Sequence, residues 1–414
     1  MAPAPKEMPP RRVTLVLCTR AASGHETVLG ALPAFDVDVP YWPETRSVVD
    51  GARLGHGVDV TVLRVLPAPP GTDPMGGAVA YLAEVSRPPD VPLAPWPGDA
   101  LAPDLLRQTW AAPGGPDADL AWADAVLAER GTPRAGRPEQ VKSWNLSSVH
   151  RLPLPDGAAW LKVVPSFFAH EGAVLARLAR LGAVGVPGLL AHDGPRVLLD
   201  ESPGADCYDA TGPRLLDMVE LLVGLQAAWV DHVDELIGLG AVDCRAPALT
   251  RAAVDTYQRT AAGLDHSTLE CLEPLLAGLE DRFAAVAACG VPDTLVHGDF
   301  HPGNLIGGSS GAPLVLLDWG DCGAGHPLLD QAAFTGRLGA ADLAAVRGTW
   351  ARLWREAVPG SEPERAAGLL APIAALRQAT VYRMFLDHIE PSERIYHETD
   401  PARWLREAAR LAAG

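Results

Sequence analysis

The stretch HGDFHPGN, residues 297–304, places an aspartate and an asparagine five residues apart in a short loop. The carboxylate of Asp299 could accept the proton of a hydroxyl group, and the side-chain oxygen of Asn304 could bind a metal ion. Phosphoryl transfer to a hydroxyl needs both functions, because the nucleophile must be aimed and the phosphate charge neutralised. Pro302 and Gly303 favour a tight turn that would fix the two side chains.

A further carboxylate follows the apolar run LVLL, which is typical of a buried strand and ends at Asp318. Trp319 and Gly320 come next. In protein kinases the catalytic loop H-R-D-L-x-x-x-N is followed by D-F-G, whose aspartate holds magnesium. Asp318 is therefore expected to bind magnesium together with Asn304.

The two stretches VHGDFHPGNLI and LVLLDWGDCGAGHPLLDQA together resemble the aminoglycoside phosphotransferase family, which includes choline-kinase-like enzymes. The resemblance covers about residues 141–414 and implies a protein-kinase-like bilobal fold. It implies an ATP- and Mg²⁺-dependent kinase for a small-molecule hydroxyl, and antibiotic resistance if the acceptor is an aminoglycoside. It also implies that Asp299 is the catalytic base, that Asn304 and Asp318 bind Mg²⁺, and that Asp330 braces the loop from behind.

A kinase also needs a strand lysine that reaches the nucleotide phosphates and pairs with a glutamate on the next helix. Lys162 lies in the β-like run AAWLKVV and is one of three lysines in the chain, the others being Lys6 and Lys142. Glu171 stands nine residues later, where a helical pattern begins. We expect Lys162 to bind the phosphates and Glu171 to pair with it.

Two further segments are expected to contact the nucleotide. The segment SWNLSSVHRL would form the loop over the phosphates, although it contains no glycine. Asn145, Ser147 or Ser148 could donate a hydrogen bond to a phosphate. The segment RVLLDESPG is expected to form the hinge. Backbone groups near Asp200 and Ser202 would then bind the adenine edge.

The elements that position these residues alternate between strand and helix patterns, so the expected fold class is α+β. Proline-rich segments and the breaker TPRAGRPEQ separate the chain into two domains. The expected domains are an N-terminal domain of residues 1–134 and a kinase domain of residues 135–414, with a β-rich N-lobe (about 141–202) and a helical C-lobe (about 203–414).

The order of elements in the N-terminal domain weakly resembles a Nudix fold. The glutamates of the Nudix motif R-E-x-x-E-E-x-G are absent, and only Glu44 lies in the corresponding neighbourhood. We therefore expect a non-catalytic domain that serves in recognition, as a lid or in homodimer formation.

The amino-acid composition disfavours several classes of binding partner. Asp and Glu number 51 against 34 Lys and Arg, so the net charge of −17 disfavours nucleic acid. No run of eighteen apolar residues and no signal peptide are found, which predicts no membrane partner and a cytoplasmic location. Six cysteines without a C-x-x-C pair are expected to be reduced and mostly buried.

Two alternative functions stay open. His297, Asp299 and His301 could form the ligand set of a metallohydrolase, since alternate residues of a strand face one side. A nucleotide-binding pseudokinase that acts through its N-terminal domain is the other alternative. A pseudokinase would lack a catalytic residue, and none is missing here.

The acceptor is the least determined part. The segment YRMFLDHIEPSERIYHETDPARWL gathers acidic residues, among them Asp387, Glu393 and Glu398, beside aromatic ones. It resembles the carboxylate-bearing tail with which aminoglycoside kinases bind cationic sugars. Carboxylates attract ammonium groups at close range. We therefore expect an amine-bearing, hydroxylated acceptor such as an amino sugar.

Overall fold

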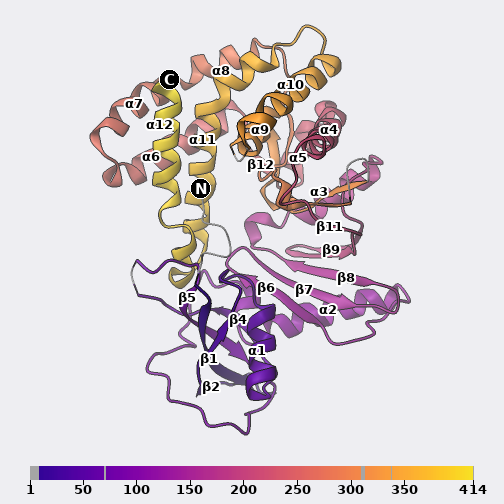
Figure 1. Cartoon of the computed structure of the whole chain (residues 1–414), viewed down its shortest axis with the longest axis vertical. Coiled ribbons are helices and arrows are strands. Elements are labelled where there is room, and N and C mark those ends of the chain that lie inside the picture. Colours follow the sequence, from indigo (N-terminus) through magenta and orange to yellow (C-terminus); the bar gives the residue numbers. More distant parts are fainter. Residues whose placement is uncertain (1–8, 70, 309–312, 337, 414) are drawn as a thin grey trace. The chain divides into compact units, whose positions relative to one another are not determined.

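The computed structural model describes residues 9–69, 71–308, 313–336 and 338–413 (Figure 1). The chain forms two compact units. Unit 1 comprises Met1–Phe167, Leu190–Glu201 and Leu386–Glu398, and unit 2 comprises Phe168–Leu189, Ser202–Phe385 and Thr399–Gly414. Strands dominate the N-terminal part and helices the C-terminal part, which confirms the predicted α+β class. The expected border between residues 134 and 135 falls within unit 1 and stays a prediction.

The first sheet of unit 1 has the strand order β2-β1-β5-β4, with β3 also paired to β1. Its strands are β1 (Arg11–Arg20), β2 (Glu26–Ala31), β3 (Phe35–Val37), β4 (Thr61–Val65) and β5 (Gly77–Glu84). Helix α1 (Arg46–His56) packs Val48 and Ala52 against one face of the sheet. The other face, which includes Val16 and Leu63, packs against Ala100. Because β1 is covered on both faces, its central residues Leu15–Cys18 are all apolar and buried instead of alternating with polar ones.

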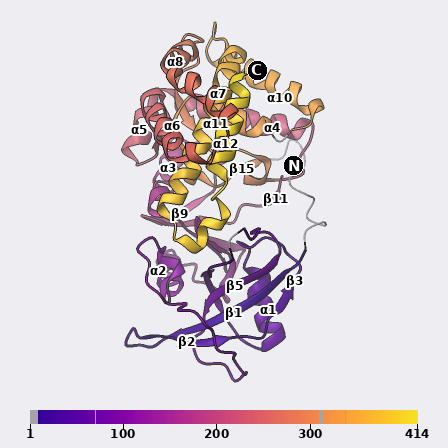
Figure 2. The same cartoon turned by 90° about the vertical axis from the view of Figure 1, so that its left-hand side faces the viewer.

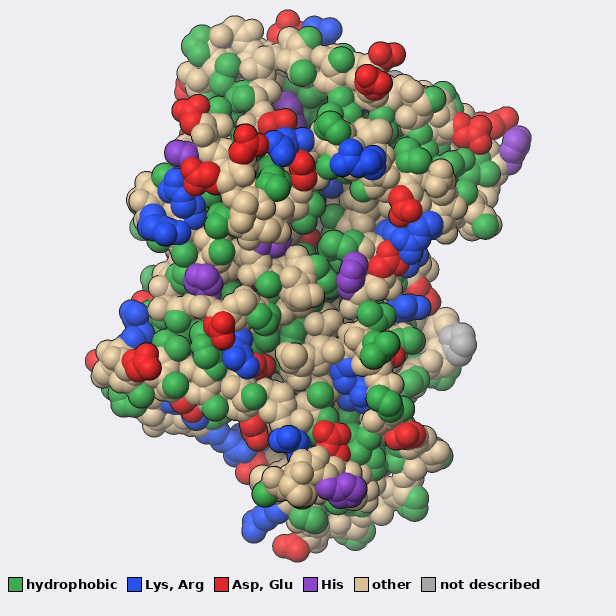
Figure 3. Space-filling model, turned by 180° about the vertical axis from the view of Figure 1, so that it is seen from behind, with side chains coloured by type: hydrophobic (Ala, Val, Ile, Leu, Met, Phe, Trp, Pro, Cys, Tyr) green, Lys and Arg blue, Asp and Glu red, His purple; other side chains and the backbone are tan. Residues whose placement is uncertain are grey.

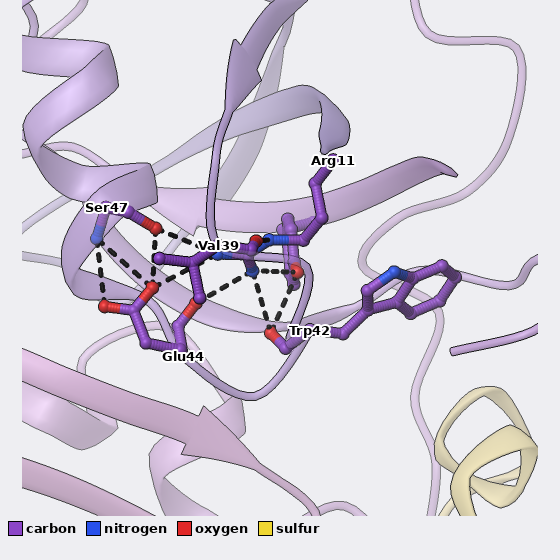
Figure 4. Close-up of polar contacts among 6 residues, drawn as sticks. Arg11, Val39, Trp42, Glu44 and Ser47 are labelled. Atoms are coloured by element: carbon purple, nitrogen blue, oxygen red, sulfur yellow. Dashed lines mark hydrogen bonds and ion pairs between the residues drawn. The ribbon is translucent and has the colours of Figure 1, made fainter. Parts of the chain in front are cut away.

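A fully buried arginine closes one end of this sheet (Figure 4). Arg11 donates hydrogen bonds to three backbone carbonyls, to a phenol, to a carboxylate and to a hydroxyl. The partners are Val39 O, Trp42 O, Glu44 O, Tyr81 Oη, Glu44 Oε2 and Ser47 Oγ. The Glu44 carboxylate also accepts from the backbone N–H of Ser47. Glu44 is thus held in a structural network.

The second sheet of unit 1 has the order β6-β7-β8-β10-β9. Its strands are β6 (Glu139–Trp144), β7 (Ser147–Pro153), β8 (Ala158–Val163), β9 (Leu189–Asp193) and β10 (Arg196–Asp200). Helix α2 (Gly115–Glu129) packs Ala123 and Leu127 against Leu152 and Leu161 of this sheet. Glycine at the start of α2 is followed by Pro116, a residue suited to the first turn of a helix.

Strand β6 is an edge strand of the second sheet, and the N-terminal part of the chain covers its outer edge. The Gln140 side chain donates to Val62 O at 2.7 Å and accepts from Val62 N at 2.8 Å, as a paired strand would. Thr45 N donates to Val141 O, and Ser143 N donates to Pro43 O, both at 3.1 Å. The two sheets of unit 1 are therefore joined through buried polar contacts.

Unit 2 is mainly helical (Figures 1 and 2). Its helices are α3 (Glu171–Arg180), α4 (Pro213–Ala228), α5 (Val233–Gly238), α6 (Ala246–Thr260), α7 (His266–Ala277), α8 (Leu279–Ala287), α9 (Leu328–Thr335), α10 (Ala340–Ala357), α11 (Pro363–His388) and α12 (Asp400–Ala413). The last residues of α11 belong to unit 1. Helix α4 packs along α10, and α7 packs along α12. Asp265 caps α7 by accepting from Thr268 N at 2.9 Å.

Two small sheets complete unit 2, in the orders β11-β14-β15 and β12-β16-β13. Their strands are β11 (Ala205–Asp206), β12 (Val242–Asp243), β13 (Thr294–Val296), β14 (Leu305–Gly307), β15 (Leu314–Leu316) and β16 (Gly323–Gly325). The described residues include six cysteines, all free thiols and five of them buried. Acidic and basic side chains are interspersed on the face in Figure 3. Within the described ranges, no helix combines the length and the apolar character that a membrane span requires.

Candidate active site

The loop of residues 297–304, here called the HGD loop, begins where β13 ends. Strand β13 is fully buried and pairs antiparallel with β16. Gly298, the next residue but one, has a φ of +92°, and a Cβ atom at this position would lie 2.2 Å from Asp321 O. Only glycine fits there, because both the dihedral angle and the close approach exclude a side chain. The glycine of HGD is thus a requirement of the turn.

The peptide groups of this turn are held from two sides. The Asp330 carboxylate, buried in the first turn of α9, accepts from His297 N and Gly298 N, each at 2.8 Å. Burial raises the pKa of Asp330. From α11, Arg377 donates to Gly298 O at 3.0 Å and to Asp321 O at 3.1 Å. Asp330 thus lies where its bracing role was expected, whereas no sequence motif pointed to Arg377.

The predicted base, Asp299, has two side chains directed at one of its oxygens. Asn304 Nδ2 donates to Asp299 O at 2.9 Å and to Asp299 Oδ2 at 3.2 Å. His301 Nε2 lies 3.4 Å from the same Oδ2. Gly303 N donates to His301 Nδ1 at 3.0 Å, so the neutral imidazole carries its proton on Nε2, facing Asp299. The Asp299 side chain is 44% exposed, which leaves it accessible to an acceptor.

Asp318 has a strained backbone directly beside this loop. Its φ of 63° makes it the single positive-φ residue other than glycine within the described ranges. The preceding residue, Leu317, donates from N to Asn304 O at 2.8 Å, and its carbonyl accepts from His297 Nε2 at 2.9 Å. Such strain costs about 1–3 kcal/mol and clusters at functional sites. The hydrogen bond from Leu317 N to Asn304 O holds the neighbouring residue Asp318 close to Asn304.

His297 is placed too deeply for the metallohydrolase alternative. Its ring is fully buried, and Nε2 is used in the hydrogen bond to Leu317 O. Burial lowers the pKa of His297, so the ring stays neutral. Across the described part of the chain, no cluster of three His, Cys, Asp or Glu side chains has metal-binding geometry. His297 and His301 shape the loop and its hydrogen bonds.

Lys162 and Glu171 lie in different units. Lys162 is on β8, the middle strand of its sheet, opposite Val149 of β7 and Val197 of β10. Glu171 opens α3 in unit 2, where it is 1% exposed. Its Oε1 accepts from Trp319 N at 3.2 Å, which links α3 to the residue after Asp318. The expected pairing of Lys162 with Glu171 stays a prediction.

The serines expected over the phosphates lie in a strand. Ser147 and Ser148 belong to β7, are 6% and 1% exposed, and Ser148 pairs with Val163 of β8. Ser147 Oγ accepts from Trp144 Nε1 at 3.1 Å. The turn of this hairpin is residues 145–146 instead. The expected loop position of the two serines is therefore corrected to a strand position, and their contact with a phosphate stays a prediction.

The expected hinge follows β10. Asp200 is exposed, and its Oδ1 accepts from the backbone N–H of Glu201 at 2.9 Å. Ser202 is half-buried and belongs to unit 2, whereas Asp200 belongs to unit 1. The chain thus passes from one unit to the other at this point, and contact with adenine stays a prediction.

The three acidic residues expected to bind the acceptor all belong to unit 1. Glu393 is 3% exposed, and its Oε1 accepts from Val65 N at 3.2 Å. Burial, with the nearby Glu390, raises the pKa of Glu393 to about 8. An enclosed carboxyl group cannot meet an acceptor in solution, so the expected role of Glu393 is corrected to a packing role. Glu398 is exposed and Asp387 is half-buried.

Comparison with known proteins gives one family and several structural likenesses. The model of the phosphotransferase enzyme family, APH, matches residues 154–369, which is more than half of the chain. No curated protein matches. A macrolide 2'-phosphotransferase from Brachybacterium faecium is 18% identical, with 67% of this chain and 97% of that chain covered and a TM-score of 0.49. A choline/ethanolamine kinase family protein from Mesorhizobium loti is 18% identical, with 72% and 100% covered and a TM-score of 0.45.

Proposed function

Because the chain belongs to the phosphotransferase enzyme family, we propose that it transfers the γ-phosphate of ATP to a hydroxyl group of an amine-bearing small molecule. Family membership confirms the predicted resemblance, its kinase-like fold and the class of enzyme, a small-molecule phosphotransferase. The choice of ATP and of the acceptor is the proposed part.

The observation that carries the proposal is the orientation of Asp299. Phosphoryl transfer needs little covalent chemistry from the protein, so positioning of the acceptor hydroxyl is the main task of the base. The Asn304 amide and the His301 imidazole both approach Oδ2 and fix the rotation of the carboxylate. The backbone of the loop is fixed in turn by Asp330 and Arg377. Asp299 would then accept the hydroxyl proton as the acceptor oxygen attacks the γ-phosphorus, and the bond between that phosphorus and the β,γ-bridging oxygen would break to release ADP.

Magnesium would be held by Asn304 and Asp318. Asn304 uses its side-chain nitrogen on Asp299, and its side-chain oxygen is the atom suited to a cation. The Asp318 carboxylate supplies charge, and its strained backbone is fixed through Leu317. Oxygen donors of these two types fit Mg²⁺. When bound, the ion would neutralise phosphate charge.

Two further residues are assigned to the nucleotide and to support of the metal ligand. Lys162 is proposed to bind the phosphates, since it is a lysine on a central strand in a chain that has only three. Glu171 is proposed to fix the backbone at Trp319 by accepting its N–H. This second role is available to Glu171 whether or not it also pairs with Lys162.

For the acceptor, Asp387 and Glu398 are the remaining candidates. Their carboxylates would attract an ammonium group, and this attraction weakens as salt rises because it is screened. Substituting both residues with the corresponding amides should raise KM for the acceptor and leave KM for ATP unchanged. Glu393→Gln serves as the matched control, since that side chain is buried.

The test of the reaction is ADP release from magnesium-ATP with a panel of amino sugars, aminocyclitols, amino alcohols and neutral sugars. We expect one class of amine-bearing acceptor to raise ADP release and to gain the mass of one phosphoryl group. A product mass without that gain, or a preference for neutral acceptors, contradicts the proposal.

The metal site is tested separately by Asp318→Ala. We expect this variant to need a higher magnesium concentration for ATP binding, which can be measured by titrating magnesium at fixed ATP. The matched control is Asp321→Ala, which removes a carboxylate three residues further along the same segment. An unchanged magnesium requirement in Asp318→Ala would remove Asp318 from the site.

A further inference from the structure

A pocket of about 250 Å³ lies in unit 2, at one end of the three-stranded sheet β12-β16-β13. Apolar side chains of α8 and α11 line it, among them Phe283, Val286 and Leu370. An apolar cavity of about 150 Å³ is enough to bind benzene, so this pocket has room for a small ring with a polar group. None of the residues assigned to phosphoryl transfer lines it.

The polar lining comes from the ends of the three strands. Cys244 follows β12, Asp293 precedes β13 and His326 follows β16. Strand β16 runs parallel to β12 and antiparallel to β13, so these three residues meet at the same edge of the sheet. The opposite end of β13 leads directly into the HGD loop.

His326 presents a buried hydrogen-bond donor at this edge. It is 6% exposed, and its Nδ1 accepts from Leu328 N at 3.3 Å, so the neutral ring carries its proton on Nε2. Burial lowers the pKa of His326 to about 3, which keeps the ring neutral. Among the described residues, Nε2 is buried and meets no hydrogen-bond partner. A buried donor left in this way is costly and indicates a ligand that accepts from it.

The other polar groups restrict what that ligand can be. Asp293 is exposed at the rim of the pocket and would repel a second carboxylate. Arg245 also lines the pocket and offsets this charge only in part, because its guanidinium already donates to Asp243 and Asp234. An ammonium group could meet Asp293, but it offers His326 no acceptor. A carboxamide offers both a carbonyl oxygen for His326 and an N–H for Asp293.

We propose that this pocket binds a small neutral molecule with an apolar body and a carboxamide end, and that its occupancy alters the HGD loop. The proposal that the pocket binds a ligand is independent of the proposed kinase function, whereas the proposed effect of the ligand on the HGD loop rests on that function. Neither Asp299 nor the residues assigned to magnesium contact the ligand in this arrangement.

Two physical connections join the pocket to the loop. Strand β13 is three residues long, so the pocket end and the loop end lie roughly 10 Å apart. Arg377 is the second connection, because it donates to Cys244 Sγ at 3.4 Å and to Gly298 O at 3.0 Å. Leu370 of the pocket lies two turns before Arg377 on the same helix. A ligand that shifts Cys244 or α11 therefore acts on the peptide next to Asp299.

Binding is tested on the full chain with three probes of similar size: benzamide, benzoate and benzylamine. We expect saturable binding of benzamide by calorimetry, at least about tenfold tighter than that of the other two, since one unmet hydrogen bond or one repulsive charge costs about 1.4 kcal/mol or more. Equal binding of the three probes, or no saturable binding of benzamide, overturns the proposal.

The location is tested by filling the pocket. Ala287→Phe places a ring in it from the exposed end of α8, and Ala288→Phe, one residue further, is the matched control outside the lining. We expect Ala287→Phe to abolish benzamide binding and Ala288→Phe to retain it. His326→Asn keeps an acceptor for Leu328 N and removes the donor, so the preference for benzamide over benzylamine should disappear. Benzamide binding that survives in Ala287→Phe places the ligand elsewhere.

The effect on the loop is read from ADP release with magnesium-ATP. Couplings between sites are typically fivefold or more, so saturating benzamide should change the rate by about that factor in the wild type and not in Ala287→Phe. Binding without a change of rate overturns the coupling. If the chain releases no ADP at all, the proposed kinase function is wrong. The binding measurements with the three probes still decide whether the pocket binds an amide.

Discussion

The buried polar network around Arg11 in unit 1 differs from the network behind the HGD loop in unit 2. The first has all its hydrogen bonds inside the protein, whereas the second leads to a side chain that is exposed to solvent. Arg11 donates only to groups within the same fold, and its side chain is fully buried (Figure 4). In unit 2 the buried Asp330 fixes the peptide groups of the loop, but the chain of contacts leads on to Asp299, whose side chain is 44% exposed.

This difference separates stability from chemistry. A network whose donors are all used inside the protein contributes to folding and presents nothing to a ligand. A network that fixes the backbone and leaves one carboxylate at the surface positions a reactive group. Glu44 is the one acidic residue near the position of the Nudix glutamates, and it belongs to the structural network around Arg11. Asp299 belongs to the network that positions a reactive group.

The largest effect is expected from Arg11→Met. Removing one member of a buried ion-paired network costs about 3–5 kcal/mol, so the free energy of unfolding should fall by about that amount. Urea unfolding measures it. Arg12→Met is the matched control, because Arg12 is an exposed neighbour paired with Asp36 and should cost less than about 1 kcal/mol. Equal losses in the two variants would contradict the distinction between the networks.

Asp299→Asn should give the opposite combination. The amide keeps the size of the side chain and cannot accept a proton, so turnover should fall by about two orders of magnitude or more. The melting temperature and ATP binding should change little, because the loop is fixed by Asp330 and Arg377. Steady-state kinetics with thermal unfolding checks both. Normal turnover would show that Asp299 is not the base.

A pH dependence of stability is expected from Glu393. Its pKa is about 8 in the folded chain, against an ordinary value of 4.5. Between these values the folded state keeps a proton that the unfolded state releases, so the free energy of unfolding falls as pH rises and levels off above about 8. One group contributes at most about 1.4 kcal/mol per pH unit. Glu393→Gln, measured by urea unfolding across this range, should flatten the slope, and an unchanged slope assigns it to other groups.

The smallest effect concerns His301 and separates its two hydrogen bonds. Asparagine can replace Nδ1 as acceptor for Gly303 N but cannot reach Asp299, whereas glutamine can reach Asp299. We expect His301→Asn to lower kcat by roughly tenfold with KM for ATP unchanged, the loss of about one oriented hydrogen bond. His301→Gln should retain more of kcat. The reverse order would mean that the bond to Gly303 is the important one.

Short sequence motifs predicted the HGD loop, but they did not predict contacts between residues that are far apart in the sequence. The HGD loop and Asp318 could be located because their chemistry is fixed by short spacings. Glu393 could not, since its burial depends on Val65, 328 residues away. Arg377 likewise carries no local motif, and its role becomes visible only where α11 passes the loop.

Ser147 and Ser148 show a different limit. The kinase pattern predicts a loop over the phosphates at SWNLSSVHRL, and serine and asparagine also favour turns. In the fold, both serines pair with β6 and Ser148 also pairs with Val163 of β8, so both belong to β7 and the turn shrinks to two residues. Strand pairing across the sheet outweighed the local preference of the residues. The Nudix-like character of the N-terminal region stays a prediction.

The residues that cover the outer edge of strand β6 also affect whether the chain associates with other copies of itself. An unprotected edge strand is a template on which further chains can pair and aggregate. Here Val62, Thr45 and Pro43 occupy the hydrogen-bonding edge of β6, and the Gln140 side chain imitates a neighbouring strand. A truncated chain beginning near residue 135 would expose that edge, and light scattering should reveal its self-association. A short designed strand that pairs with β6 should restore solubility.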